Sequence, residues 1–224
     1  MKPNLVISRA IPWREGLTMP TTNDDREAIL SRVRGALAPL HERAPLPAYD
    51  SEMAVMRKLI AGRDLVELFA ERIKRVNGLA LTEPAALVAH LRAGKRLHGY
   101  CDPALWPELA PHFGADFKVE AVFDRKRVDD YAFGITRAAG AIAESGTIIL
   151  NDAGTSNRLA ALAPWVHVAV VARATIFGDV TQAVAALGAD RNVIWCTGPS
   201  KTADVEGILI EGVHGPGEQI ALVV

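Results

Sequence analysis

The sequence of 224 residues has only two cysteines, Cys101 and Cys196, and they lie far apart. No Cys-x-x-Cys spacing occurs, so the sequence indicates no disulfide framework and favours a reducing, cytoplasmic setting. Iron–sulfur clusters are commonly held by four thiolates. We therefore expect this chain alone to hold no such cluster.

The chain also lacks an excess of charge and a long apolar run. Lys and Arg number 25, Asp and Glu number 26, and the formal net charge is −1. This balance gives no electrostatic argument for binding nucleic acid or an anionic membrane. No apolar run approaches the roughly 20 residues that span a bilayer, and Met1–Pro20 lacks the apolar core of a signal peptide. We expect a chain that binds no nucleic acid and has no membrane span.

The first fifty residues are predicted to form a flexible N-terminus, one helix and a Pro-rich linker. Met19 stands just before a helix signal, so either translation begins there, leaving residues 1–18 outside the native protein, or the first twenty residues are a disordered tail. Acidic residues open a helix over 24–37 whose apolar residues have helical spacing. Prolines end this pattern, and residues 40–50 resemble a linker. This helix is expected to pack on its own domain or on a neighbouring subunit.

Residues 51–224 are predicted to form a single α/β domain. A helix from about Met53 to Val76 is kinked or split at Gly62, and Thr82 is placed as the N-cap of the next helix. Strands are predicted over 78–81, 96–100, 118–123, 132–136, 147–151, 166–172, 193–196 and 220–224, and helical segments over 84–92, 103–110, 138–143, 180–187 and 205–210. Such alternation implies a mixed, largely parallel sheet flanked by helices, with an N-terminal helical extension.

Three glycine-containing segments lie near strand ends, and ligands of open α/β sheets bind beyond the carboxyl ends of strands. The first segment is Ala143–Thr147. Gly146 permits a tight turn or the close approach of a ligand. Glu144 is a candidate nucleophile, general base or hydrogen-bond anchor. The alternative is a surface turn with a solvated Glu144.

The second segment, Thr197–Asp204, lies between a predicted strand and a predicted helix. Backbone N–H groups at a helix start, together with Ser200, Lys201 and Thr202, predict an anion site. The alternative is an ordinary capping loop. The spacing is not that of a Walker loop, and the chain contains no Gly-x-Gly-x-x-Gly fingerprint for a dinucleotide.

The third segment, Gly212–Gly217, surrounds His214 with glycine and proline. His214 is a candidate proton shuttle, whereas a structural turn histidine is the more common case. A metal site built from His214, Asp204 and Glu206 matches no known ligand spacing, so no metal is predicted. Asn157 and Arg158 are candidate substrate contacts, with Asn157 also a candidate helix N-cap. The remaining histidines form no pattern: His41, His90, His98, His112 and His167.

In this order, the segments Gly134-Ile135-Thr136, Ile142–Thr147, Gly198–Asp204 and Gly212–Pro216 resemble the lactate utilization protein C family, also called the LUD domain. The resemblance covers about Asp24 to Val224, and its motifs are specific from Phe133 onward. The family usually has Thr where Ser145 stands. It often has Arg where Lys201 stands, and Ile where Val205 stands.

The resemblance implies a role in oxidising L-lactate to pyruvate together with two iron–sulfur partner proteins, this chain being the cluster-free member. It also implies a fold similar to that of sugar-phosphate isomerases and CoA transferases. In CoA transferases a Glu-x-Gly turn supplies the carboxylate nucleophile, and Glu144 occupies a similar short turn.

The leading hypothesis is a cytoplasmic subunit that binds a small carboxylate or phosphate in a cleft formed by the three segments. Glu144 and His214 would transfer protons. The residues expected to bind the substrate or anion are Gly146, Thr147, Gly198, Ser200, Lys201, Thr202, Asp204 and Gly215. A non-catalytic assembly protein, or an isomerase or transferase acting on a sugar phosphate or CoA ester, are the alternatives. The sequence leaves a homo-oligomer open.

Overall fold

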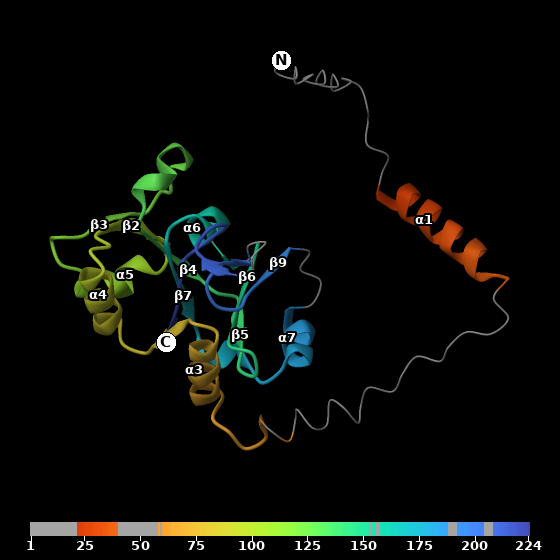
Figure 1. Cartoon of the computed structure of the whole chain (residues 1–224), viewed down its shortest axis with the longest axis horizontal. Helices are drawn as coiled ribbons and strands as arrows, with labels where there is room; N and C mark the ends of the chain where they lie inside the picture. The colour runs from red at the N-terminus through yellow and green to blue at the C-terminus, as the bar shows by residue number, and fades with distance from the viewer. Residues whose placement is uncertain are drawn as a thin grey trace, which may run out of the picture. The chain divides into compact units, whose positions relative to one another are not determined.

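The computed structural model describes residues 22–39, 58, 60–152, 154–155, 157–187, 192–203 and 208–224 (Figure 1). The chain divides into two compact units, Met1–Tyr49 and Asp50–Val224. In the first unit, helix α1 (Thr22–Leu37) has Asp24 and Asp25 in its first turn, which confirms the predicted helix. Residues 1–21 and 40–57, including the proposed start at Met19 and the linker, lie outside the described residues.

The second unit is built on a six-stranded sheet in the order β1-β12-β7-β4-β2-β3, in which every pairing is parallel. The central strands β4, β7 and β12 are apolar because both of their faces are covered, as is usual in parallel sheets. The strands of this sheet are β1 (Leu79–Leu81), β2 (His98–Cys101), β3 (Lys118–Glu120), β4 (Phe133–Arg137), β7 (Val166–Val171) and β12 (Glu218–Val223). The predicted α/β class with a largely parallel sheet is therefore confirmed.

A smaller sheet has the order β8-β5-β6-β9, with β5 and β6 forming an antiparallel hairpin. A separate two-stranded hairpin pairs β10 with β11. The strands of these two sheets are β5 (Gly140–Ile142), β6 (Thr147–Asn151), β8 (Ile176–Phe177), β9 (Val193–Cys196), β10 (Lys201–Ala203) and β11 (Leu209–Glu211).

The helices and the sheets of this unit are arranged in layers (Figure 1). Helices α4 (Pro84–Ala93) and α5 (Trp106–Leu109) bury leucines on one face of the large sheet. Helix α3 (Leu65–Arg75) and helix α6 (Arg158–Leu162) pack on the opposite face, in the core that this face shares with the small sheet. Helix α7 (Val180–Leu187) covers the far side of the small sheet through Ala183. The remaining short helices are η1 (Ala110–His112), η2 (Arg125–Asp130) and η3 (Arg173–Thr175).

Two predicted helical segments are strands in the structure. Within the predicted turn of helix over 138–143, residues 140–142 form β5, because Gly146, with a φ of 69°, closes a hairpin to β6 that pairs the backbones of the two strands. The predicted helix over 205–210 is wrong at its end, since Leu209 and Ile210 lie in β11 and pair with β10. Residues 204–207 lie outside the described residues.

Two predictions at helix starts also need correction. The long helix was predicted to be kinked or split at Gly62. It is split, since Gly62 has a φ of 74° and α3 begins only at Leu65. Asp64, whose side chain accepts a hydrogen bond from the Glu67 amide, is the N-cap of α3. The N-cap of α4 is Glu83 rather than Thr82, because Pro84 occupies the first helical turn. Within the described part of the chain, no helix has the length and apolar character needed to cross a membrane.

Candidate functional site

Two of the motif glycines support the C-terminal half of α3. A Cβ atom on Gly146 would overlap the backbone nitrogen of Ile73, and a Cβ on Gly198 would overlap the carbonyl oxygen of Val76. Both glycines also have positive φ values, 69° and 74°, that favour glycine. The β5–β6 turn and the loop after β9 therefore form a seat for the end of this helix, here called the α3 seat.

Lys201 belongs to the α3 seat. Its Nζ donates a hydrogen bond to the Val76 carbonyl oxygen over 3.3 Å and lies 3.5 Å from Oε1 of Glu211. Asn77 donates to the same Glu211 oxygen over 2.8 Å. A cation at the C-terminal end of a helix stabilises the helix dipole. The ammonium group of Lys201 therefore interacts with the C-terminal end of α3 and with Glu211.

Glu144 is engaged in a second structural contact. Its carboxylate accepts a hydrogen bond from the backbone N–H of Val180, the first residue of α7, over 3.0 Å. A carboxylate at that position caps the helix and meets the positive end of its dipole. Beside it, the hydroxyl of Thr147 lies 2.7 Å from that of Ser145 and 2.8 Å from that of Thr197. This chain of hydroxyls joins the first motif to the second.

The second and third motifs meet around a cavity of about 280 Å³, here called the motif pocket. Two backbone hydrogen bonds hold them together, from the Ser200 amide to the Pro216 carbonyl and from the Gly212 amide to the Ser200 carbonyl. Gly215 permits this approach, since a Cβ there would lie 3.1 Å from Cβ of Ser200. The described residues lining the pocket are Leu162, Trp195, Cys196, Thr197, Gly198, Pro199, Ser200, His214, Gly215, Pro216 and Gln219.

The position of the motif pocket differs in part from the expected one. It lies beyond the carboxyl end of β9, as predicted, but at the amino ends of β7 and β12 in the large sheet. The third motif precedes β12, so it reaches the pocket from the side opposite to the usual ligand crevice of a parallel sheet. The pocket is therefore formed between the two sheets and not at one common edge.

A buried polar trio that the sequence analysis missed lies behind the pocket. Nε2 of His167 is 2.9 Å from the Thr136 hydroxyl, and Nδ1 of His167 faces the side-chain amide of Gln219. Thr136 and His167 are fully buried, and Gln219 is 3% exposed. Burial lowers the pKa of His167 to about 4, so its ring is neutral at pH 7. A signal was present, because His167 interrupts an otherwise apolar strand and Gln219 directly precedes the apolar run Ile220–Val223.

The structure places some of the predicted site residues at the motif pocket and others at the α3 seat. Gly198, Ser200, His214 and Gly215 line the motif pocket, whereas Gly146 and Lys201 lie at the α3 seat. Thr202 lies in β10, and Asp204 is outside the described residues. Their binding or catalytic roles stay predictions.

The two further candidate contacts have structural partners. Asn157 is the N-cap of α6 and accepts from the Ala160 amide over 3.1 Å, as its alternative interpretation predicted. The guanidinium of Arg158 forms an ion pair with Asp152 over 3.0 Å. Both side chains therefore organise the segment between β6 and β7.

Cys196 lines the pocket, but its chemistry there is limited. Burial raises the pKa of its thiol to about 11, so the thiol stays protonated at neutral pH and is a poor nucleophile. Burial likewise raises the pKa of Cys101 to about 12. Among the described residues, no group of three or more His, Cys, Asp and Glu side chains is arranged to hold a metal ion.

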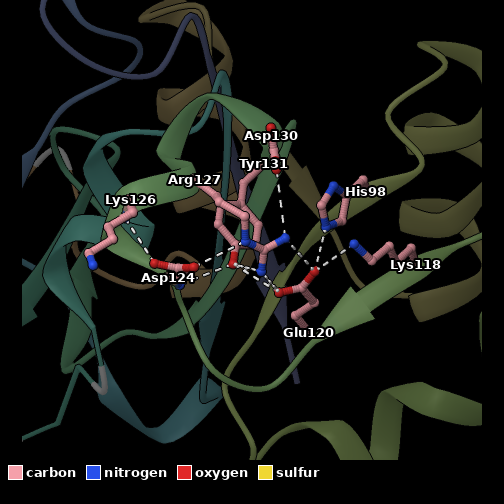
Figure 2. A network of polar contacts seen from close by, with 8 residues as sticks. All are labelled: His98, Lys118, Glu120, Asp124, Lys126, Arg127, Asp130 and Tyr131. Atoms are coloured by element: carbon pink, nitrogen blue, oxygen red, sulfur yellow. Dashed lines mark hydrogen bonds and ion pairs between the residues drawn. The ribbon is translucent and has the colours of Figure 1, made fainter.

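The densest polar cluster lies elsewhere, at the end of β3 and on η2 (Figure 2). The carboxylate of Glu120 receives contacts from Arg127 at 2.7 Å, Lys118 at 2.8 Å, His98 at 2.9 Å and Tyr131 at 3.0 Å. The hydrogen bond from Arg127, followed by those from Lys118 and His98, holds the pKa of Glu120 well below its usual range. Each of these four side chains contacts the same carboxylate, so we interpret the cluster as a structural link between η2 and β3.

Comparison with known proteins identifies the family. The model of the LUD domain matches residues 88–224. The lactate utilization protein C of Deinococcus radiodurans is 30% identical over 219 residues, which cover 92% of this chain and 99% of that protein. The protein of the same name from Bacillus licheniformis is 36% identical over 107 residues, but the match covers only 44% of this chain and 45% of that protein.

A solved structure supports the same conclusion. The crystal structure of a DUF162 family protein from Deinococcus radiodurans superposes with a TM-score of 0.54 at 25% sequence identity, over 71% of this chain and 96% of that chain. Taken with the match over residues 88–224 and the similarity along nearly the whole sequence, these findings show that the chain belongs to the LUD domain family of lactate utilization proteins C.

Proposed function

We propose that this chain takes part in L-lactate utilization, as a component of a system that oxidises L-lactate to pyruvate. The observation that carries the proposal is the similarity to the lactate utilization protein C of Deinococcus radiodurans, which extends over 92% of this chain. The matched region includes both motifs of the pocket. Fold alone would not support a function, since one fold serves many activities.

The proposal places the redox centres on partner proteins. Oxidation of a 2-hydroxy acid to a 2-keto acid releases an electron pair, which an acceptor must take up. Cys101 and Cys196 belong to different core clusters, and both thiols have raised pKa values. These two thiols favour no cluster on this chain alone. The family resemblance implies two iron–sulfur proteins of the same pathway, and we assign the clusters to such partners in the cytoplasm.

We further propose the motif pocket as the binding site for a small carboxylate. Ser200 and Thr197 line the pocket with hydroxyl groups and the loops around Gly198 and Gly215 with backbone, and His214, which also lines it, would exchange a proton with the ligand. Lys201 and Glu144 do not line this pocket among the described residues. Their contribution is indirect, through the ends of α3 and α7.

The experiment is complementation of a strain that lacks the gene, grown on L-lactate or on glucose. The wild-type chain should restore growth on L-lactate, and His214→Gln should reduce it without affecting growth on glucose. His112→Gln, which changes an exposed histidine outside the pocket, is the matched control. Undiminished growth of the deletion strain on L-lactate would refute the pathway role, and full complementation by His214→Gln would refute only the role of His214.

A second candidate function, assembly without chemistry, is favoured by helix α1. Ile29 and Val33 are four residues apart on this helix, so they lie on one face of it. An apolar stripe of this kind on a helix is suited to docking in a groove of a partner protein. Replacing both residues with Asp should abolish co-purification with the iron–sulfur partners while leaving the motif pocket intact. If a complex forms normally with this variant, α1 is not the docking element.

A further inference from the structure

The side of β7 and β12 that faces α3 and the small sheet is apolar except at one place. Ala169, Val171, Ala221 and Val223 on this side are buried in the core. His167 and Gln219 are direct cross-strand partners on the same side, at the amino ends of the two strands. Burying polar groups in an apolar core is costly unless they are hydrogen-bonded, so an all-apolar pair would be the simpler structural solution.

The hydrogen-bonding capacity of Gln219 is larger than its neighbours can use. Oε1 and Nε2 of Gln219 lie 3.2 Å and 2.9 Å from Nδ1 of His167. A ring nitrogen either donates or accepts, so Nδ1 satisfies one of these amide atoms at a time. Gln219 also lines the motif pocket. The rest of its amide is therefore available to a ligand in that pocket.

The position of the amide is fixed from behind. The Thr136 hydroxyl lies 2.9 Å from Nε2 of His167, and all three side chains are at least nine-tenths buried. A hydroxyl both donates and accepts, so Thr136 suits either tautomer of the neutral ring. Thr136 and His167 thereby fix the position of the Gln219 amide, and the tautomer of the His167 ring sets whether the amide oxygen or the amide nitrogen is left for a ligand.

The chemistry of the pocket indicates what this amide would recognise. Trp195, Pro199 and Leu162 give the pocket apolar walls, and Gln219 adds an uncharged polar group to its lining. An amide accepts a hydrogen bond from a hydroxyl and donates one to a carbonyl oxygen. One residue can therefore bind both the 2-hydroxy acid and the 2-keto acid of an oxidation couple.

We infer that Gln219 is the specificity-determining residue that binds the oxygen on C2 of a small 2-hydroxy or 2-keto monocarboxylate in the motif pocket. His167 and Thr136 are its positioning residues. The inference rests on the proposed function, because it takes the ligand of the pocket to be L-lactate or pyruvate. It adds a residue that lies in none of the three motifs.

The test is a titration of the full chain, labelled with ¹⁵N, with L-lactate, pyruvate and propionate, the last of which lacks an oxygen on C2. L-lactate and pyruvate should bind about three- to tenfold more tightly than propionate, the ratio expected from one hydrogen bond. The side-chain NH₂ signal of Gln219 and the ring nitrogens of His167 should shift with the first two ligands and not with propionate. In Gln219→Met the three affinities should become equal.

The positioning role has its own readout. Thr136→Val should reduce the discrimination against propionate and change the tautomer balance of His167 seen in its ring ¹⁵N shifts, and Thr136→Ser should restore both. Thr136→Val keeps the side-chain volume nearly constant and Thr136→Ser removes one methyl group but keeps the hydroxyl, so the two variants complement Gln219→Met if that variant folds poorly. Discrimination unchanged by Thr136→Val, with the His167 signals also unchanged, would overturn the positioning role.

The outcomes separate this inference from the proposed function. If all three carboxylates shift the backbone amides of Gly198 and Gly215 with equal affinity, the pocket binds carboxylates and the role of Gln219 is overturned. Discrimination that survives in Gln219→Met overturns it as well. If none of the three shifts those amides, the proposed ligand of the pocket is wrong, and the inference fails with it.

Discussion

The α3 seat and the motif pocket adjoin each other and share Gly198, yet their motif residues serve different purposes. At the seat, Gly146 and Gly198 matter because they lack a side chain, which lets the end of α3 approach their backbones. At the pocket, Ser200 and His214 matter through the groups that they present to the cavity. A single family signature therefore combines residues required for packing with residues available for binding, and only the second set is a candidate active site.

The largest expected effect is a loss of stability caused by a substitution at the α3 seat. Gly198→Ala should lower the free energy of unfolding by roughly 4 kcal/mol, because the new Cβ overlaps the Val76 carbonyl and the residue has a φ of 74°. Gly62→Ala is the matched control, since Gly62 has the same φ and no atom lies within 4 Å of its Cβ position. Gly62→Ala should lower the free energy of unfolding by only about 1 kcal/mol. If urea unfolding gave the same loss of stability for Gly198→Ala and Gly62→Ala, the close packing at the α3 seat would be contradicted.

The next largest effect is a pH dependence of stability that arises from His167, behind the motif pocket. The pKa of His167 is about 4 in the folded chain and about 6.5 when unfolded, so the unfolded state binds more protons between these values. This contribution to stability is complete above about pH 6.5, falls as the pH decreases, and is lost below about pH 4. Its size is on the order of 3 kcal/mol. His167→Gln should lack it, and parallel stability curves for variant and wild type from pH 8 to pH 4 would contradict the buried neutral ring.

A smaller effect is expected for the hydroxyl groups near the pocket. Ser200→Ala should weaken L-lactate binding about three- to tenfold, because one hydrogen bond is removed, while stability remains nearly unchanged. Thr202→Val removes a hydroxyl two residues away, in β10 and outside the pocket lining. It should leave the dissociation constant unchanged. A loss of affinity in Thr202→Val equal to that in Ser200→Ala would extend the site beyond the pocket.

Lys201 distinguishes the two regions most sharply. Lys201→Met should lower stability by less than about 1 kcal/mol, through loss of its contacts with Val76 and Glu211, and leave ligand affinity unchanged. Calorimetric titration and urea unfolding measure the two quantities. If affinity falls and stability does not, Lys201 binds the anion as the motif predicted, and its assignment to the seat is wrong.

The smallest effect is expected for Glu144→Gln. The amide oxygen of Gln can still accept from the Val180 N–H, so stability should change by less than about 0.5 kcal/mol. Growth on L-lactate should be unaffected, because Glu144 caps α7 and does not line the pocket. A stable variant that fails to support growth would restore Glu144 as a catalytic carboxylate.

Much of the fold was predictable because buried parallel strands such as β7 and β12 appear in the sequence as apolar runs. The errors fall where pairing with a neighbouring strand of a hairpin decides the conformation. Residues 140–142 and 209–210 become strands because β6 and β10 supply hydrogen-bonding partners for their backbones. Local periodicity over so few residues does not separate a strand from a turn of helix.

The candidate site was predicted less completely, for a similar reason. The loops around Ser200 and His214 carry glycine and proline, which mark turns, and both loops line the pocket. The use of Lys201 was not predictable, because its partner Val76 is 125 residues away in the sequence. Thr136, His167 and Gln219 lie in three different strands, and only the order of the sheet brings them together.

The most direct test of the account is the response of backbone amide signals when L-lactate is added to the full-length chain. The amides of Ser200, Gly215 and Gln219 should shift in proportion to saturation, while that of Gly146 at the α3 seat stays in place. This result would establish the motif pocket as the ligand site. Shifts confined to Gly146 and Lys201, or no shift at the pocket at saturating L-lactate, would contradict it.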